Sequence, residues 1–299
     1  MAAFEALRTR YWRWCERALS APPLLGWQLL RQALRGQRPF ISESIPAGTP
    51  LFVLSTGRCG THTLSVLLGL AADVQAFHEP LPDLRSLANQ VYHTPQPDLK
   101  LCDEALRLAR SQLWQATNMA GRRYVETSHY LSFLAPVLLH LLPAARFLHL
   151  TRAPQPFVSS ALRLGWFADS DKFSPCPGSS AATDWDSRDA FAKSVWYWAE
   201  INRFARDFVC ALPPGQGLQL RSEDIFAAEP QSMCRLFALV DSEPPPQRRI
   251  RRVLGHSLNA GHHNYDLRSL HGFSAAQLKF LQQECAALAR ELGYESVTG

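Results

Sequence analysis

Residues 51–64 read Leu51-Phe52-Val53-Leu54-Ser55-Thr56-Gly57-Arg58-Cys59-Gly60-Thr61-His62-Thr63-Leu64. An apolar run leads into a turn that contains two glycines, and a helical spacing of apolar residues begins after it. Short apolar runs that end at turn residues are typical of buried strands. We therefore predict a strand over residues 51–55 that turns directly into a helix over residues 61–70.

The turn between this strand and this helix has the composition of an anion site. Gly57 and Gly60 permit a tight backbone path, and the N–H groups at a helix N-terminus attract negative charge. Arg58 adds a planar, permanently charged fork of donors that suits phosphate or sulfate oxygens, and Thr61 and Thr63 add hydroxyls. The turn lacks the lysine of the nucleotide-hydrolase pattern GxxxxGK[ST]. The alternative is an ordinary strand-to-helix turn without a ligand.

Strand and helix patterns alternate along the rest of the chain. Further strands are predicted at residues 74–77, 124–126, 146–151 and 218–221, and further helices at residues 100–118, 131–142, 154–164, 188–212 and 275–292. Residues 81–99 and 168–187 are predicted as loops. Such alternation is typical of a parallel sheet with helices on both faces. We predict a three-layer α/β fold with a central parallel sheet of about five strands flanked by helices.

Composition indicates one large domain. The 299 residues include 46% hydrophobic and 19% charged residues, enough apolar material for a substantial core, and we assign this domain to residues 46–299. Residues 1–45 form a basic amphipathic segment, predicted to be a helical extension; weak peripheral contact with a membrane is the alternative. The net charge of +5 is explained either by a solvated surface with excess arginine or by arginines gathered at a polyanionic ligand. No nucleic-acid partner is predicted.

The cysteines favour a reducing compartment. Seven of them are scattered along the chain, and none forms the CxxC pair of zinc or redox sites. We expect most to be reduced and packed as small apolar groups, which fits a cytoplasmic protein. The sequence contains neither a run of ~18 consecutive apolar residues nor the pattern of a secretory signal. The histidines near residue 262 are not accompanied by a known zinc motif, so no metal site is predicted.

A second candidate anion-binding segment follows the strand predicted at residues 146–151. Arg152 comes directly after that strand, and Ser160 follows eight residues later on the next predicted helix. Because the helix returns the serine to the same edge, the two side chains can hold one phosphate by charge and hydrogen bond. The structural alternatives are a surface ion pair for Arg152 and a hydrogen bond from Ser160 back to its own helix.

These two segments resemble the nucleotide-binding motifs of the sulfotransferases that use 3′-phosphoadenosine 5′-phosphosulfate (PAPS). The turn is similar to the family's 5′-phosphosulfate loop, R-[ST]-G-T-[ST], with Cys59 in place of serine or threonine. Arg152 and Ser160 match its 3′-phosphate motif, R-[DN]-P-x-[DE]-x-x-x-S, although Ala153 and Pro156 replace acidic residues common there. The resemblance implies a P-loop-like sulfotransferase architecture. The cofactor-binding residues that it implies are Gly57, Arg58, Cys59, Gly60, Thr61, His62, Thr63, Arg152 and Ser160.

The resemblance also implies a catalytic base. His78 and Glu79 follow the strand predicted at residues 74–77, and ligands of parallel sheets bind outside the carboxyl ends of the strands. Many sulfotransferases that act on sugars or proteins carry a glutamate here that takes the proton from the acceptor, so Glu79 is the expected base and His78 the alternative. Arg58 is expected to stabilise charge on the departing oxygen. The structural alternative for Glu79 is a cap on the next helix.

Two further groups of residues have an expected role in the site or in the core. Residues 126–129, Glu126-Thr127-Ser128-His129, follow the third predicted strand and are expected to reach the same edge. Either Ser128 or His129 contacts the acceptor there, or Thr127 or Ser128 caps a helix. The adjacent aromatic residues 196–198 are expected to pack in the core.

The resemblance runs from about residue 50 to about residue 295, and two weaker matches support it. Residues 218–225 are similar to a family segment whose acidic pair caps a helix, and residues 258–264 lie where the family has a loop over the nucleotide. The implied function is transfer of a sulfuryl group from PAPS to a hydroxyl or amine of a carbohydrate, lipid or small molecule, without a metal. The rival hypotheses are a magnesium-dependent P-loop kinase or nucleotide hydrolase and a catalytically silent nucleotide-binding scaffold.

Overall fold

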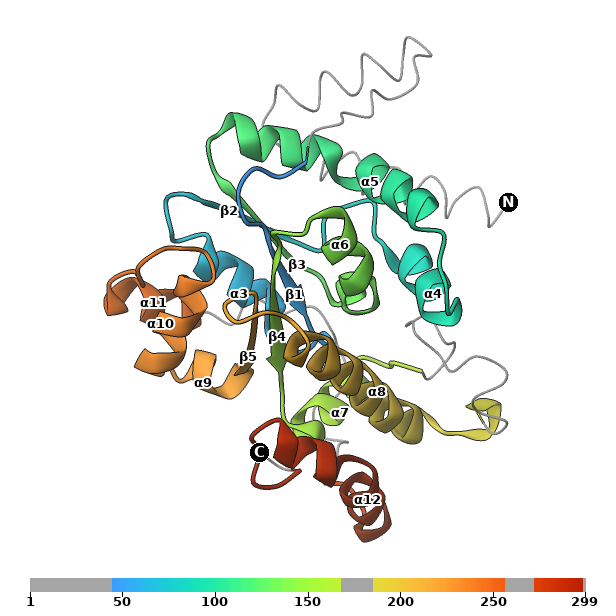
Figure 1. The fold of residues 1–299 in the computed structure, drawn as a ribbon. Coiled ribbons are helices and arrows are strands. Elements are labelled where there is room, and N and C mark those ends of the chain that lie inside the picture. Colours follow the sequence, from blue (N-terminus) through green and yellow to red (C-terminus); the bar gives the residue numbers. More distant parts are fainter. Residues whose placement is uncertain (1–44, 168–184, 256–271, 298–299) are drawn as a thin grey trace, which may run out of the picture. The chain divides into compact units, whose positions relative to one another are not determined.

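Five parallel strands lie at the centre of the computed structural model, which describes residues 45–167, 185–255 and 272–297. All of these residues belong to the unit Ser44–Gly299. The strand order in the sheet is β2-β3-β1-β4-β5, and helices cover both faces (Figure 1). The predicted three-layer α/β fold is confirmed. The strands are β1 (Leu51–Leu54), β2 (Val74–His78), β3 (Arg123–Thr127), β4 (Arg146–Thr151) and β5 (Gly217–Arg221).

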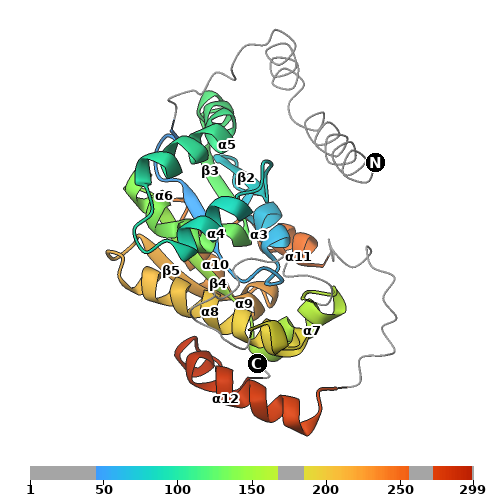
Figure 2. The same cartoon turned by 90° about the vertical axis from the view of Figure 1, so that its right-hand side faces the viewer.

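The helices of the described residues divide between the two faces of the sheet. Their bounds are α3 (Thr61–Leu68), α4 (Arg85–His93), α5 (Leu99–Met119), η1 (His129–Leu134, a 3₁₀ helix), α6 (Ala135–Leu141), α7 (Pro154–Arg163), η2 (Trp185–Ser187, also 3₁₀), α8 (Ala190–Cys210), α9 (Ser222–Phe226), α10 (Pro230–Ala238), α11 (Gln247–Leu254) and α12 (Ala275–Glu291). Helices α3, α10 and α11 share one apolar cluster, and α4, α5 and α6 share another. Figure 2 shows α12 beside α7 and α8, with which it forms a third cluster. Each of these described helices is too short or too polar to cross a membrane.

Strand β1 is the middle strand of the sheet and carries the turn predicted to bind an anion. It pairs with β3 on one side and with β4 on the other. Its four side chains are buried because both edges are paired and both faces are covered. Leu51 and Val53 pack in the cluster of α3, whereas Phe52 and Leu54 pack in the cluster of α5, since successive side chains of a strand point to opposite faces.

Two predicted elements differ from the structure. The prediction of a loop over residues 81–99 is wrong, because α4 lies there and α5 already begins at Leu99, after Asp98 accepts hydrogen bonds from the first amides of that helix. Ala88 is the sole fully buried residue of α4, so this helix has too narrow an apolar face for its period to be recognised. The helix predicted over residues 131–142 is two elements, η1 and α6, and Pro136 lies at the start of α6, where its missing N–H is tolerated.

Helices α9, α10 and α11 were not predicted. The helix α11 buries Ile250 alone, and its four arginines hide the helical period in the sequence. Three other predictions fall outside the described residues: the extension over residues 1–44, the loop over residues 168–184 and the segment at residues 258–264.

Candidate functional site

The turn after β1 has a backbone that requires glycine at two positions. Gly57 and Gly60 have φ angles of +73° and +79°, in the left-handed region that favours glycine. A Cβ atom on Gly60 would lie 2.3 Å from the ring of Phe226, and one on Gly57 would lie 3.3 Å from the ring of His129. Helix α3 begins after Gly60, which offers no capping side chain. The amides of its first turn therefore point beyond the turn, where an anion can accept from them.

The side chain of Cys59 points into the turn. It is buried, its Sγ donates to the carbonyl oxygen of Gly57 at 3.2 Å, and it lies 3.2 Å from the hydroxyl of Thr56. Burial raises the pKa of the Cys59 thiol to about 11, so the thiol remains protonated at neutral pH. The amide of Gly57 donates to the hydroxyl of Ser55 at 3.1 Å. The Cys59 side chain and the Gly57 amide were both predicted to bind the cofactor. In the structure, each makes its hydrogen bonds to other atoms of the turn.

The two predicted anion-binding segments meet at one edge of the sheet. Nη1 of Arg152 donates to the carbonyl oxygen of Arg58 at 2.8 Å, and Nε of Arg58 donates to the hydroxyl of Ser160 at 3.1 Å. The pKa of Arg58 is lowered, first by burial and then by the charges of Arg152 and Arg163. Mutually repelling guanidinium groups stabilise a bound anion, because its negative charge offsets their repulsion.

The first turn of α3 supplies the remaining predicted residues. Thr61 and Thr63 are buried there. The ring of His62 stacks on the ring of His78, with centroids 4.9 Å apart and planes 5° from parallel. His62 therefore links the turn to the end of β2.

Residues from the far half of the chain hold Arg152 in place. The indole N–H of Trp198 donates to the carbonyl oxygen of Arg152 at 2.8 Å. The next amide, of Ala153, donates to the carboxylate of Glu223 at 3.0 Å, and that carboxylate also accepts from the hydroxyl of Tyr294 at 3.0 Å. The prediction that the acidic pair of residues 223–224 caps a helix is wrong, because α9 has no side-chain cap. Glu223 instead braces the turn after β4.

His78, the last residue of β2, has a fixed ring orientation. Its Nδ1 donates to the carbonyl oxygen of Thr127 at 2.8 Å, which leaves the lone pair of the neutral ring on Nε2. Burial lowers the pKa of His78 below its ordinary value of 6.5. The ring is therefore neutral at pH 7 and able to accept a proton.

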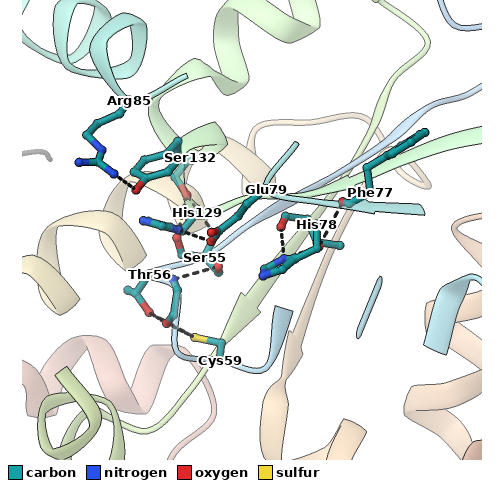
Figure 3. Close-up of polar contacts among 12 residues, drawn as sticks. Ser55, Thr56, Cys59, Phe77, His78, Glu79, Arg85, His129 and Ser132 are labelled. Atoms are coloured by element: carbon teal, nitrogen blue, oxygen red, sulfur yellow. Dashed lines mark hydrogen bonds and ion pairs between the residues drawn. The ribbon is translucent and has the colours of Figure 1, made fainter. Parts of the chain in front are cut away.

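Glu79, the next residue, is held by His129 (Figure 3). Its Oε1 accepts a hydrogen bond from Nδ1 of His129 at 2.8 Å. Burial by itself raises the pKa of Glu79, but the hydrogen bond and charge of His129 outweigh it, and the pKa falls to about 2. The side chain is 37% exposed, so an ionised carboxylate stands accessible at the strand ends. Its backbone φ of 45° is strained for a residue other than glycine, as is common at functional sites.

The pairing of Glu79 with His129 was not predicted. It follows from the register of the sheet, in which His78 of β2 lies opposite Thr127 of β3. Glu79 directly follows β2 and His129 is the second residue after β3, so both lie at the same end of the paired strands. The predicted cap by Glu79 is wrong, since the N-cap position of α4 is Leu84 and that helix has no side-chain cap.

Residues 126–129 do not all reach the edge of the sheet. Glu126 is buried beneath it and accepts two hydrogen bonds from Arg110, both at 2.9 Å, and one from the hydroxyl of Tyr124 at 2.6 Å. Capping by Thr127 or Ser128 is also absent, because η1 has no side-chain cap in the structure described. The hydroxyl of Thr127 instead lies against the end of β2.

The candidate site thus combines a cationic turn, an ionised carboxylate and a neutral histidine. Arg58 and Glu79 lie within electrostatic reach, because each shifts the pKa of the other. An anion on the turn and a hydroxyl at Glu79 would therefore be neighbours, as group transfer requires. Among the described residues, no group of three or more His, Cys, Asp or Glu side chains is arranged to hold a metal ion.

Solved structures with a similar fold include several sulfotransferases. Sulfotransferase STF9 from Mycobacterium avium has a TM-score of 0.52 at 15% identity, with 91% of this chain and 83% of that chain covered. STF1 from Mycobacterium tuberculosis H37Rv has a TM-score of 0.50 at 14% identity, covering 90% of this chain and 89% of that one. The sulfotransferase domain from the curacin biosynthetic pathway has a TM-score of 0.50 at 15% identity, covering 84% of this chain and 100% of that one. At such identities the likeness concerns the fold.

Comparison of sequences identifies the family. No curated protein matches the chain significantly. A family model described as the sulfotransferase family matches residues 50–245. This range includes the turn after β1, the ends of β2 and β3, and the segment that begins at Arg152. This match covers more than half of the chain, and it agrees with the P-loop-like sulfotransferase fold. The chain therefore belongs to the sulfotransferase family.

Proposed function

We propose that this protein transfers a sulfuryl group from PAPS to a hydroxyl group of an acceptor. The observation that carries the proposal is the contact between the two anion-binding segments, in which Arg152 donates to Arg58 and Arg58 donates to Ser160. PAPS carries anionic groups at both ends of its ribose. Residues 57–63 would hold the 5′-phosphosulfate, and Arg152 and Ser160 would hold the 3′-phosphate.

Glu79 is the proposed base. The acceptor oxygen forms a bond to sulfur while the bond from sulfur to the bridging phosphate oxygen breaks. The acceptor proton passes to the Glu79 carboxylate, and adenosine 3′,5′-bisphosphate (PAP) leaves. A carboxylate with a pKa of about 2 is a weak base. A weak base suits a loose transition state, because the acceptor proton becomes acidic only once the bond from oxygen to sulfur has largely formed. Arg58 and the amides of the turn stabilise the charge that develops on the departing oxygen.

His78 is the alternative base. Its neutral ring carries a lone pair on Nε2, and it lies one residue from Glu79 against His62 of the turn. The two bases predict different pH dependences, because burial lowers the pKa of His78 from 6.5 whereas that of Glu79 is about 2.

Two further parts of the proposal concern the whole chain. Residues 46–299 would form the catalytic domain and residues 1–45 a basic extension, with weak peripheral contact to a membrane as the alternative. The partners would be the nucleotide and an acceptor, with no nucleic acid. A cytoplasmic location is proposed from the scattered, unpaired cysteine pattern of the sequence.

Thermal-shift titration with PAP, and separately with ATP and Mg²⁺, tests the nucleotide. We expect PAP to stabilise the protein without a metal, by ~2.7 kcal/mol at a concentration 100 times its Kd. Stronger stabilisation by ATP with Mg²⁺ would favour the kinase or hydrolase hypothesis. Transfer of radiolabelled sulfate from PAPS to a panel of acceptors then tests catalysis. Binding of PAP without transfer to any acceptor would favour the silent scaffold.

A further inference from the structure

The chain around Arg152 lacks a local cap for the helix that follows it. Residues 152–156 read Arg152-Ala153-Pro154-Gln155-Pro156. Helix α7 begins here without a side-chain cap, and its two prolines have no N–H to donate. The orientation of Arg152 therefore depends largely on contacts from other parts of the chain.

The residues after α12 supply several of these contacts. The amide of Gln155 donates to the carbonyl oxygen of Val297 at 3.0 Å, which satisfies an amide that the first turn of a helix leaves open. Nη1 of Arg221, the last residue of β5, donates to the carbonyl oxygen of Gly293 at 2.8 Å. Residues 293–297 therefore join the end of β5 to the start of α7.

The side chain of Tyr294 bonds to both strand ends. It is 3% exposed, and its hydroxyl donates to the carboxylate of Glu223 at 3.0 Å and lies 2.8 Å from the hydroxyl of Thr151. Burial, and then the charge of Glu223, raise the pKa of Tyr294, so the hydroxyl keeps its proton. Because Tyr294 has one proton to donate and Glu223 accepts it, the hydroxyl of Thr151 must donate to Tyr294. The hydrogen bonds thus run in one direction, from β4 through Tyr294 to Glu223.

The same hydrogen bonds reach both neighbours of Arg152 in the chain. Thr151, on one side, is bonded to Tyr294 directly. On the other side the amide of Ala153 donates to Glu223 at 3.0 Å, so Ala153 is linked to Tyr294 through that carboxylate. A charged side chain whose backbone is fixed on both sides loses less conformational freedom when it binds a ligand.

We propose that Tyr294 is a positioning residue that directs Arg152 at the 3′-phosphate of the nucleotide. The inference rests on the proposed function, in which Arg152 holds that phosphate. Tyr294 lies beyond the residues 50–245 that match the family model, so the match assigns it no role. Without the Tyr294 hydroxyl, the buried hydroxyl of Thr151 loses its acceptor and Glu223 loses a donor, so the backbone beside Arg152 is held less firmly.

Two nucleotides test this inference: PAP, and adenosine 5′-monophosphate (AMP), which lacks the 3′-phosphate. Calorimetry measures the Kd of PAP, and competition against PAP measures that of AMP. Tyr294→Phe should raise the Kd of PAP about 5- to 20-fold, because a buried hydrogen bond that positions the charged donor is lost. It should leave the Kd of AMP unchanged, since AMP offers Arg152 no 3′-phosphate. Tyr92→Phe, which removes a hydroxyl bonded to Glu200, is the matched control and should change neither Kd.

A double variant tests whether Tyr294 acts through Arg152. Adding Tyr294→Phe to Arg152→Ala should change the Kd of PAP little, because the guanidinium that Tyr294 positions is already gone. An increase as large as that in the wild-type background would overturn the inference, since Tyr294 would then act on PAP by another route.

The measurements separate failure of the inference from failure of the proposed function. A wild type that prefers PAP to AMP, with a Tyr294→Phe variant that keeps this preference, overturns the inference alone. An equal loss of affinity for both nucleotides also overturns it, because that result is expected of a merely structural tyrosine. A wild type that binds PAP no more tightly than AMP overturns the assignment of the 3′-phosphate, and with it the proposed function.

Discussion

Replacing His129 with phenylalanine tests what keeps the Glu79 carboxylate ionised. The change preserves a ring against Gly57 but removes the N–H that donates to Glu79 at 2.8 Å. Once that hydrogen bond is lost, burial is the largest remaining influence on Glu79, and burial raises its pKa. We expect the pKa of Glu79 to rise from about 2 toward its ordinary value of 4.5, with the charge of Arg58 still lowering it.

The size of the effect can be worked out from this shift. A full return by about 2.5 pKa units would correspond to about 3.4 kcal/mol at 1.36 kcal/mol per unit, which is the upper bound. Because the side chain is 37% exposed, solvent screening reduces this to about 1–2 kcal/mol. A lowered carboxylate pKa stabilises the folded state above the unfolded pKa near 4.5, and that stabilisation is lost as the pH falls toward 2. The variant should therefore be less stable at pH 7, and the difference should shrink below pH 4.5.

Urea unfolding at pH 7 and at pH 4 measures this stability difference. The pH dependence of kcat/KM identifies which residue acts as the base. In the wild type, Glu79 is ionised at every pH from 4.5 to 8, so it should contribute no acid limb. In His129→Phe, an acid limb should enter as the pH falls toward 4.5, and His78→Gln should leave the wild-type profile flat. A wild-type rate that falls below pH 6.5, and that becomes flat in His78→Gln, would refute Glu79 as the base and assign the proton to His78.

Three further predictions concern the rest of the site and its support. Arg152→Ala should weaken PAP binding about 10- to 100-fold by calorimetry, because it removes a charged donor, whereas the exposed Arg203→Ala should leave the affinity unchanged; equal affinities would contradict the assignment of the 3′-phosphate. Arg110→Ala should lower the free energy of unfolding by about 3–5 kcal/mol because Glu126 would be left buried without its partner, and a loss below about 1 kcal/mol in urea would contradict this. Cys59 has a thiol pKa raised by burial to about 11, so at pH 8 iodoacetamide should modify exposed cysteines first; early labelling of Cys59 in peptide mass spectra would speak against the packed turn.

The parts of the fold that were predictable are those whose side chains are buried on both faces. Strand β1 and strand β4 read as apolar runs because helices cover both faces of the sheet, and the positions of Arg152 and Glu79 agree with the rule that ligands bind at strand ends. The helices α4 and α11 lack a recognisable pattern of apolar residues in the sequence. Each buries one residue, and their stability comes from tertiary contacts that local periodicity does not record.

The partners of the candidate residues were harder to predict than the residues themselves. The hydrogen bond between His129 and Glu79 depends on the register of β2 against β3, which the sequence of either strand alone does not specify. Tyr197 was expected in the core, and it lies there, but its unpaired hydroxyl becomes visible only once neighbouring helices are packed. Glu223 was expected to cap a helix, whereas it reaches across to the amide of Ala153.

The crowding of Arg58, Arg152 and Arg163 has a consequence for the release of the product nucleotide. In the proposed reaction the sulfuryl group departs with the acceptor, whereas the product nucleotide keeps both of its phosphates and therefore its electrostatic attraction to the site. Its exit restores the repulsion among the guanidinium groups, which adds to the effect of burial in lowering the pKa of Arg58. We expect product departure, rather than bond cleavage, to limit turnover, so that moderate salt should raise kcat at saturating donor by weakening this electrostatic retention.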